Sequence, residues 1–478
     1  MNLLSIESAE LIRADIRTRL PFKYGIATMV DVPHVFLRLA VRTPAGVFTG
    51  LAADHLPPKW FTKDPTCPIP REIYDMLAVV VHAATAARGI SAPSVFEFWR
   101  TLWADQEAWA RTRNYPPLLA QFGTSLVERA LIEAVARSEQ TNFQQLLHGD
   151  RLGLDLGAIH PELAGTTPAG WLPPRAAATV YCRHTVGLAD PLREADIALA
   201  DRLDDGLPQS LEAGIRQYGL RHFKIKVDGN NPEAALVRLR NVFAVLAAGV
   251  PDGLAYSLDG NESFASADSF RSFWERIEAE PALQPMLRHL LFVEQPVSRL
   301  VALDATKADL KTWVGRPPII IDESDGDLAD LPVALALGYA GTSHKNCKGI
   351  LKGVANACLI AHRRSQEPGA RLILSGEDLC NIGPVALLQD LAVQAVLGVG
   401  SIERNGHHYF AGLSSWPSSI QQAVIAAHPD LYETSAHGWP KLLIRDGRIS
   451  TQSVVAAPLG VGGALPLDDI PGERIAIG

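Results

Sequence analysis

Cysteine is scarce in this sequence, and its spacing fits neither a disulfide framework nor a zinc site. The 478 residues include 5 cysteines, which are widely separated and form no C-x-x-C pair. An odd, scattered set is typical of a reducing compartment, because disulfides persist mainly in oxidising ones. We therefore expect a cytoplasmic protein in which most of the cysteines are small buried side chains.

Long apolar runs and targeting signals are missing as well. The longest apolar stretches, Leu77 to Ala87 and Val242 to Val250, fall short of the ~20 apolar residues that a bilayer span requires. Residues Met1 to Glu7 show no cationic region followed by a long apolar stretch, so we expect no signal peptide. Neither feature predicts a membrane partner.

Positive charge is neither in excess nor clustered. The chain has 44 Lys+Arg against 52 Asp+Glu, a net charge of −8, and its longest basic run is the pair Arg363 and Arg364. Phosphate backbones are bound by clustered Lys and Arg, so this distribution argues against a nucleic-acid partner. The phosphate-binding motifs G-x-G-x-x-G and G-x-x-x-x-G-K-[ST] and the zinc motif H-E-x-x-H are also missing.

What the sequence does contain is enough apolar residue, 47%, for a large core. Residues 1–150 predict an α+β domain, because alternating strand patterns come first and helical periods follow. The predicted strands are 11–17, 34–41 and 47–51, and the predicted helices are 73–88, 95–112 and 117–137. Gly, Pro and Thr then dominate residues 155–174, where we place a junction between domains.

Beyond the junction, short β-rich runs alternate with helical patterns. The runs are 179–184, 222–227, 254–258, 290–294, 319–321, 339–343, 372–374 and 401–403. Parallel strands with intervening helices over about 225 residues are typical of a (β/α)8-type barrel, which places its chemistry where strands end and loops begin. We expect this barrel to span residues 175–405, and residues 406–478 to pack back on the rest of the protein.

Consecutive runs of the predicted barrel end in charged residues. Asp259, Glu294 and Asp322 follow one another at intervals of one strand and one helix, so they would meet at one rim of the barrel. Carboxylates this close require raised pKa values or a cation between them. Oxygen ligands alone favour Mg²⁺, or Mn²⁺ or Ca²⁺, over Zn²⁺. A helix N-cap would explain one such acid, but not the succession.

Lysines end the neighbouring runs. Lys224 and Lys226 share one face of a strand, so mutual repulsion is expected to lower the pKa of at least one of them and make it a general base near neutral pH. Lys345 follows a later strand and would approach a metal-bound substrate from the other side. Lys348 and Lys352 are better explained as solvated lysines.

These motifs together resemble the enolase superfamily, and within it the muconate lactonizing enzyme branch of the mandelate racemase/muconate lactonizing enzyme family. The chain has K-x-K at 224–226, D-x-N at 259–261, E-Q-P at 294–296 and D-E-S at 322–324, followed by the lysine segment 345–349. Residues 126–147 are similar to the last helix of that family's capping domain. The resemblance implies a modified TIM barrel, (β/α)7β-like, with an N-terminal α+β capping domain.

The resemblance also implies a reaction. Mg²⁺ held by Asp259, Glu294 and Asp322 would bind a small carboxylate substrate, Lys226 or Lys345 would remove the α-proton, and an enediolate would form, as the superfamily is known to do. Lys224 would adjust Lys226, and the chain would assemble as a homo-oligomer. The further residues implied for positioning or substrate contact are Asn261, Glu323, Tyr24, Glu377 and Glu403.

Several segments depart from the family pattern. The sixth-strand segment is more polar than expected, which leaves open whether Lys345 or Lys348 faces the substrate. The seventh segment, 375–381, is unusually acidic, so that Glu377 is either part of a helix cap or a substrate contact. Residues 21–25 occupy the place of a lid, which Trp60 and Phe61 would extend if they do not simply pack. His407 and His408 are better explained by packing than by substrate contact.

The outcome of the reaction stays open at this point. Lysines on both faces favour a racemase, epimerase or cycloisomerase, whereas one base with another proton donor would give a dehydratase for hydroxy acids or acid sugars. A Schiff-base aldolase would use the same lysines but leave the carboxylates unexplained. A barrel that binds a carboxylate without turnover is the alternative of another class.

Overall fold

The computed structural model describes residues 3–477, which begin with a long antiparallel sheet. Its strands are β1 (Leu4–Tyr24), β2 (Ala27–Thr43) and β3 (Gly46–His55), with the short β4 (Ser91–Ala92) beside β1. β1 and β2 are longer than their sequence pattern predicted. Irregular register between Ile6 and Ser8 and between Arg17 and Phe22 breaks the period-two alternation on which the prediction depended.

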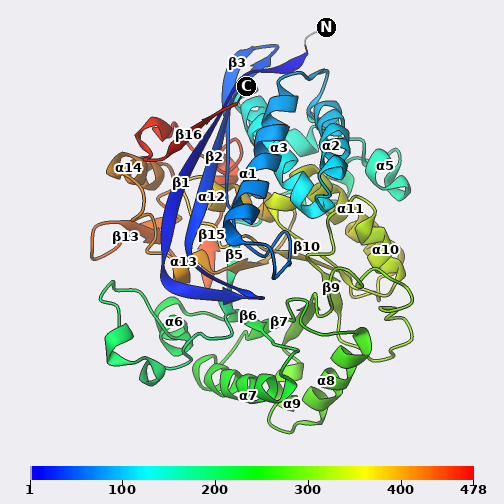
Figure 1. Ribbon diagram of the computed structural model, residues 1–478, viewed down its shortest axis with the longest axis vertical. Coiled ribbons are helices and arrows are strands. Elements are labelled where there is room, and N and C mark those ends of the chain that lie inside the picture. Colours follow the sequence, from blue (N-terminus) through cyan, green and yellow to red (C-terminus); the bar gives the residue numbers. More distant parts are fainter. Residues whose placement is uncertain (1–2, 478) are drawn as a thin grey trace.

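Three helices pack beside this sheet (Figure 1). They are α1 (Ile69–Ala87), α2 (Val95–Thr112) and α3 (Pro117–Ser138). α2 starts where the Ser94 side chain accepts a hydrogen bond from the Glu97 amide, and α3 starts at a proline, as helix N-termini favour. α3 is buried almost throughout its length, because it lies between the sheet, the other two helices and the barrel.

The sequence prediction of a closed barrel is confirmed. Its strands are β5 (Thr179–Val186), β6 (His222–Lys226), β7 (Ala255–Asp259), β8 (Leu290–Glu294), β9 (Ile319–Ile321), β10 (Gly341–His344), β11 (Ile373–Gly376) and β12 (Ser401–Arg404). All neighbours pair in parallel, and β12 closes the barrel by pairing with β5, Ile402 opposite Cys182. Every β-rich run predicted beyond the junction forms one of these strands.

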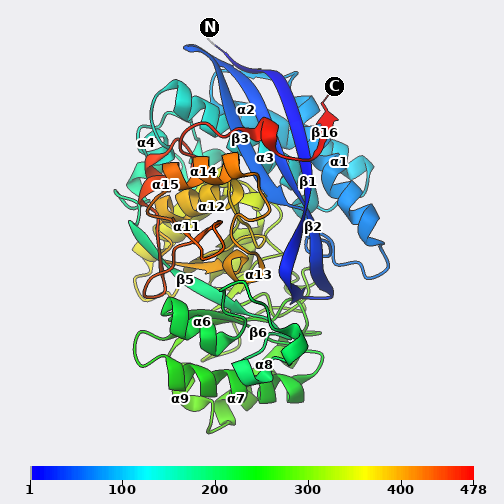
Figure 2. The same ribbon diagram turned by 90° about the vertical axis from the view of Figure 1, so that its left-hand side faces the viewer.

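Helices cover the outside of the barrel (Figures 1 and 2). The main ones are α6 (Leu211–Tyr218), α7 (Pro232–Gly249), α8 (Ala267–Ala279), α10 (Asp330–Ala336), α11 (Ile350–Gln366) and α12 (Ala386–Val396). The other α-helices lie in the remaining connections: α4 (Phe143–His148), α5 (Leu156–Ile159), α9 (Gln284–Leu287), α13 (Gly406–Tyr409), α14 (Ser418–Ala427) and α15 (Gln452–Ala456). None of the helices within residues 3–477 combines the length and the hydropathy that crossing a bilayer requires.

The last part of the chain contacts both the barrel and the N-terminal sheet. β15 (Arg448–Ser450) pairs antiparallel with β5, and β16 (Glu473–Ala476) pairs antiparallel with β1, Leu11 opposite Ile475. A small hairpin, β13 (Tyr432–Thr434) and β14 (Pro440–Leu442), precedes both strands in the sequence. Figure 2 shows the turn between β1 and β2 reaching down to the barrel beside β6, where it covers the carboxyl ends of the strands.

Candidate active site

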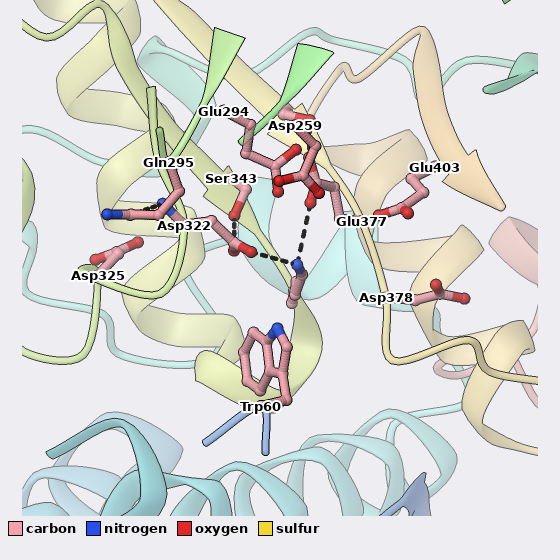
Figure 3. A network of polar contacts seen from close by, with 12 residues as sticks. Trp60, Asp259, Glu294, Gln295, Asp322, Asp325, Ser343, Glu377, Asp378 and Glu403 are labelled. Carbon is pink, nitrogen blue, oxygen red and sulfur yellow. Dashed lines mark hydrogen bonds and ion pairs between the residues drawn. The ribbon is translucent and has the colours of Figure 1, made fainter. Parts of the chain in front are cut away.

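The charged residues predicted at the strand ends converge in one buried cluster at the carboxyl end of the barrel. Lys224 and Lys226 lie on β6, Asp259 ends β7, Glu294 ends β8, and Asp322 follows β9. Lys345 follows β10, Glu377 follows β11, and Glu403 lies on β12. All of these side chains are buried. Figure 3 shows Asp259, Glu294, Asp322 and Glu377 pointing toward one another, with Trp60 between them and the cap helices.

Lys224 is the centre of this cluster. Its Nζ lies 2.8 Å from Glu294 Oε1 and 3.0 Å from carboxylate oxygens of Asp259, Glu377 and Glu403. Burial alone would lower the pKa of Lys224, but these carboxylates outweigh it and hold the pKa well above its ordinary value. The expectation of a lowered pKa from repulsion by Lys226 is therefore wrong for Lys224.

Lys226 and Lys345 flank the cluster from opposite sides. They belong to β6 and to the end of β10, which are four strands apart in a barrel of eight. Lys226 Nζ donates to Asp259 Oδ2 at 2.6 Å, whereas Lys345 Nζ donates to Asp322 Oδ2 at 2.7 Å and to Glu377 Oε2 at 3.0 Å. A group held between the two ammonium nitrogens would be accessible from either face.

Lys345 and Lys348 differ in whether they line the cavity of the cluster. Lys345 lines the cavity of the cluster, and its Nζ lies 5.0 Å from the centre of the Trp60 ring. Lys348 is buried behind Asp322, where its Nζ donates to the Asp322 carbonyl at 2.7 Å and to Ser343 Oγ at 2.8 Å. The sequence interpretation of Lys348 and Lys352 as solvated side chains is therefore wrong. Both are buried, Lys348 against Asp322 and Lys352 against Asp325.

Glu294, Asp322 and Glu377 each offer an oxygen within 4.8 Å of the other two. Among the described residues, Glu294 Oε2 has no hydrogen-bond partner, although it is buried. Burial, reinforced by the charges of Asp259 and Glu377, raises the pKa of Glu294 well above its usual range. Nearby lysines overcome burial at Asp322 and Glu377, whose pKa values lie well below the usual range. An all-oxygen set with one free buried oxygen fits a hard divalent cation.

Asp259 has both of its oxygens occupied, as Asp322 and Glu377 do. Oδ2 accepts from Lys226, and Oδ1 accepts the Asn261 amide at 2.8 Å. The backbone between them is tightly placed: a Cβ on Gly260 would lie 2.6 Å from Pro296 Cα, and Asn261 and Glu262 have φ of 43° and 58°. Strained backbone of this kind is typical of functional loops. The three predicted metal ligands therefore share one cluster, but the carboxylates whose oxygens lie within 4.8 Å of one another are Glu294, Asp322 and Glu377.

The remaining predicted residues line the same cavity. Tyr24 donates its hydroxyl to the Pro58 carbonyl at 2.8 Å and, with Phe22, covers the cluster from the β1–β2 turn. Glu323 is buried, and burial together with the Asp322 charge raises its pKa to about 7. Asn261 and Glu403 complete the wall. Trp60 lines this cavity as well, which supports its interpretation as part of a lid.

Sequence reasoning missed Arg183 and Arg299. Arg183 Nη2 lies 3.1 Å from Glu377 Oε1 and donates to Ser375 Oγ at 2.7 Å, so it fixes Glu377 from the first barrel strand. Its signal is weaker than that of the other charged residues, because Arg183 lies within the first β-rich run rather than after its end. Arg299 lies in a long loop after β8, where no pattern marks its partner Glu262.

His407 and His408 pack away from the cluster, as expected. Both are buried, and His407 Nε2 lies 3.1 Å from His184 Nδ1. Burial lowers the pKa of His408 to about 3. Neither imidazole lines the cavity of the acidic cluster within the part of the chain that the structure describes. The cysteines are all free, and four of them are buried, in agreement with the sequence analysis.

Comparison with solved structures identifies the fold of this chain, whereas comparison with curated protein sequences finds no match. No protein-family model matches the chain, and no curated protein sequence matches it. Solved structures do match over nearly their whole lengths. A mandelate racemase/muconate lactonizing protein from Herpetosiphon aurantiacus has a TM-score of 0.61 at 14% identity, and the match covers 96% of this chain and 99% of that one.

Two further structures were determined with ligands. An enolase from Bradyrhizobium in complex with magnesium and mandelic acid has a TM-score of 0.59 at 14% identity, covering 100% of both chains. A dipeptide epimerase from Methylococcus capsulatus in complex with Mg and the dipeptide L-Arg-D-Lys has a TM-score of 0.56 at 17% identity, covering 96% of this chain and 99% of that one. This chain therefore has the fold of the enolase superfamily.

Proposed function

We propose that this protein is an enzyme that removes the proton α to the carboxylate of a small substrate, with the help of a divalent cation. The observation that carries the proposal is the placement of Lys226 and Lys345 on opposite sides of a buried carboxylate cluster. An α-proton next to a carboxylate is very weakly acidic, so its removal requires both a base and nearby positive charge. This cluster brings both together in a site that excludes most water.

Glu294 and Asp322 are the residues best suited to hold the cation, together with Asp259 or Glu377. The free Oε2 of Glu294 supports this assignment, since a buried carboxylate oxygen without a donor favours a cation. Mg²⁺ is the ion we expect, with Mn²⁺ as the alternative. When bound, it would supply positive charge where the substrate carboxylate becomes more negative as its α-proton leaves.

Lys226 and Lys345 are the residues that would accept and return the α-proton of the substrate. Lys226 Nζ is positioned by one carboxylate, Asp259, and Lys345 Nζ by two, Asp322 and Glu377. Lys224 stays bound to its carboxylates and balances their charge. Trp60 and Tyr24 close the cavity over the reacting carbon and keep water from it.

The placement of the two lysines favours racemisation or epimerisation over elimination. One lysine removes the α-proton from one face, and the other returns a proton to the opposite face of the same carbon. Cycloisomerisation would use only one of them. A dehydratase would need an acid beside the leaving hydroxyl instead, and no contact among residues 3–477 singles out such a group.

Hydrogen exchange in D2O tests this proposal. The protein with Mg²⁺ is incubated with hydroxy, amino and sugar acids, and loss of α-proton signals is followed by NMR. We expect exchange with at least one class of acid in the native chain. Lys226→Met should lose at least about 100-fold in rate with the enantiomer whose α-proton faces Lys226. Lys441→Met, on β14 away from the cluster, serves as the control. Binding of acids without any exchange would favour the non-catalytic alternative.

A binding measurement identifies the cation ligands without depending on turnover. Calorimetric titration of Mn²⁺ into Glu294→Gln and Asp322→Asn should show affinity at least about tenfold weaker than in the native chain. Comparing Asp259→Asn with Glu377→Gln then decides which carboxylate is the third ligand, because only that variant loses comparable affinity. Unchanged Mn²⁺ affinity in all four variants would exclude a cation site in this cluster.

A further inference from the structure

A second, larger cavity lies directly outside the cluster. It has a volume of about 590 Å³, whereas the cavity over the lysines has about 40 Å³. We call them the outer and inner cavities. The outer cavity is within the size range of sites for small organic ligands, while the inner one has room for only a few water molecules.

The same three loops form both cavities. Trp60, Asn261 and Glu323 line the inner cavity, and the next residue of the first two loops, Phe61 and Glu262, lines the outer one. Glu323 lines both, and it is the one residue shared by the two linings among the residues described. We call Trp60, Asn261 and Glu323 the partition between the cavities.

Two buried acceptors in this partition are unused. Asn261 Oδ1 and Glu323 Oε2 are buried and have no hydrogen-bond partner within residues 3–477. Buried polar atoms are nearly always paired, so unpaired ones at the junction of two cavities indicate a missing donor. Water bound at this junction, or a polar group on a bound ligand, would supply that donor.

The first loop of the partition is tied to the barrel rather than fixed by its own packing alone. Arg299 donates to the carbonyls of Trp60 and Phe61, both at 2.9 Å, and forms an ion pair of 2.7 Å with Glu262. Lys63 lies 3.6 Å from the same carboxylate. These hydrogen bonds from Arg299 to backbone carbonyls hold the Trp60 segment at the partition between the cavities.

The walls of the outer cavity contain both apolar and acidic residues. The apolar ones include Phe61, Pro117 and Leu303. Asp64, Asp327 and Asp330 add negative charge and form no ion pair among the described residues, whereas the cations Lys63 and Arg299 both pair with Glu262. An uncharged or cationic group fits these walls, and a second carboxylate does not.

We infer that the outer cavity binds the distal part of the substrate, which is then a carboxylic acid with an extended apolar substituent that is uncharged or cationic at its end. This inference rests on the proposed function, since it places the carboxylate and the α-carbon between the lysines. The inner cavity accommodates little more than these atoms. The substituent leaves past Asn261 and Glu323 and lies against Phe61 and Leu303.

Straight-chain acids that cannot undergo stereochemical change are suitable probes. Acetate, hexanoate, 6-aminohexanoate and adipate are titrated into the full chain with Mg²⁺, and binding is measured by calorimetry. Each methylene that leaves water strengthens binding about three- to fourfold. Hexanoate and 6-aminohexanoate should therefore bind at least about tenfold more tightly than acetate, and adipate should not.

Variants test whether the outer cavity supplies this preference. Leu303→Trp narrows it and should reduce the advantage of hexanoate over acetate to less than about threefold. Leu300→Trp acts at its rim, where Leu300 is 87% exposed and the fold is not at risk. Val314→Trp, at a 92% exposed position outside both cavities, is the matched control and should keep the native preference.

Equal affinity for acetate and hexanoate, tightest binding of adipate, or an undiminished preference in both cavity variants would overturn the inference. The titration does not involve proton transfer. If hexanoate binds as expected but no acid exchanges its α-proton, the proposed reaction fails while the outer cavity stands as a binding site. If exchange occurs and the four probes bind alike, only the inference about the outer cavity fails.

Discussion

Replacement of Lys224 by Met tests whether its ammonium balances the carboxylate cluster. Lys224 has contacts of 2.8–3.0 Å to four buried carboxylates, and its side chain is 2% exposed. Removal of one partner from a buried ion pair typically costs about 3–5 kcal/mol, because the remaining charge is left uncompensated. We expect the free energy of unfolding of Lys224→Met to fall by about that amount in the absence of divalent cations.

Lys352→Met is the matched control. Lys352 is also 2% exposed and lies 2.7 Å from a buried carboxylate, that of Asp325, but it is separate from the cluster. Its replacement should destabilise the protein to a similar extent. The two variants should then differ in their response to Mg²⁺, because only Lys224 lies among the proposed ligands of the cation.

The size of that difference follows from the charges. Two unit charges 4 Å apart interact by about 4 kcal/mol at an effective dielectric constant of 20, so the Lys224 ammonium opposes a bound divalent cation strongly. If the loss of this ammonium makes Mg²⁺ bind even tenfold more tightly, saturating Mg²⁺ stabilises the folded variant by about 1.4 kcal/mol more than it stabilises the native chain. Urea unfolding with and without 10 mM Mg²⁺ measures this difference.

We therefore predict that Mg²⁺ raises the free energy of unfolding more in Lys224→Met than in Lys352→Met or the native chain. The difference should be about 1.4 kcal/mol or more. Equal increments in all three proteins would refute the reasoning, since they would separate the cation from the carboxylates that Lys224 contacts. An undiminished stability of Lys224→Met without Mg²⁺ would refute the assumed charge balance itself.

Three further outcomes are expected elsewhere in the molecule. Burial raises the pKa of Glu128 to about 8, so the stability that its proton supplies is complete below pH 4.5 and is lost as pH rises to about 8. Between pH 6 and pH 9 the native chain should therefore lose about 3 kcal/mol of unfolding free energy that Glu128→Gln keeps, as urea titrations at both pH values would measure. Parallel pH profiles would contradict this. Arg299→Ala should speed tryptic cleavage at Lys63, because the Trp60 and Phe61 carbonyls lose their hydrogen bonds to Arg299. Mass spectrometry follows the cleavage, and an unchanged rate would show that packing alone holds this segment. Gly260→Ala should lower stability by about 1–3 kcal/mol in a thermal melt, whereas Gly170→Ala, with open space around it, should not; equal melting temperatures would mean that the loop gives way without cost.

The strand ends of the barrel could be predicted from the sequence because their signals are local. An apolar run followed by Asp259, Glu294 or Asp322 marks the end of a parallel strand, and the order of such runs fixes which residues face each other around the barrel. The segment at Glu377 stands out in the sequence by its acidity, which departs from the family pattern. The position of Lys224 within the cluster follows from its place on the strand, but its raised pKa does not, because the carboxylates that cause it come from four other strands.

Other parts of the site depend on tertiary contacts that no sequence period encodes. Arg299 and Glu262 belong to irregular loops, so their pairing and its hold on Trp60 emerge only from the fold. Lys348 reads as a solvated lysine after a strand, but the chain turns it inward behind Asp322. The length of β1 was underestimated, since its register irregularities interrupt the alternation that predicts a strand.

The stereochemistry of α-proton exchange tests the central claim most directly. Once an exchanging acid is known, its two enantiomers are incubated separately in D2O with Lys226→Met, Lys345→Met and the native chain. Two lysines on opposite faces predict that the native chain exchanges the α-proton of both enantiomers. They also predict that each variant loses exchange with one enantiomer, a different one in each case, and retains it at least in part with the other. Equal loss for both enantiomers in one variant, with no effect in the other, would contradict the account.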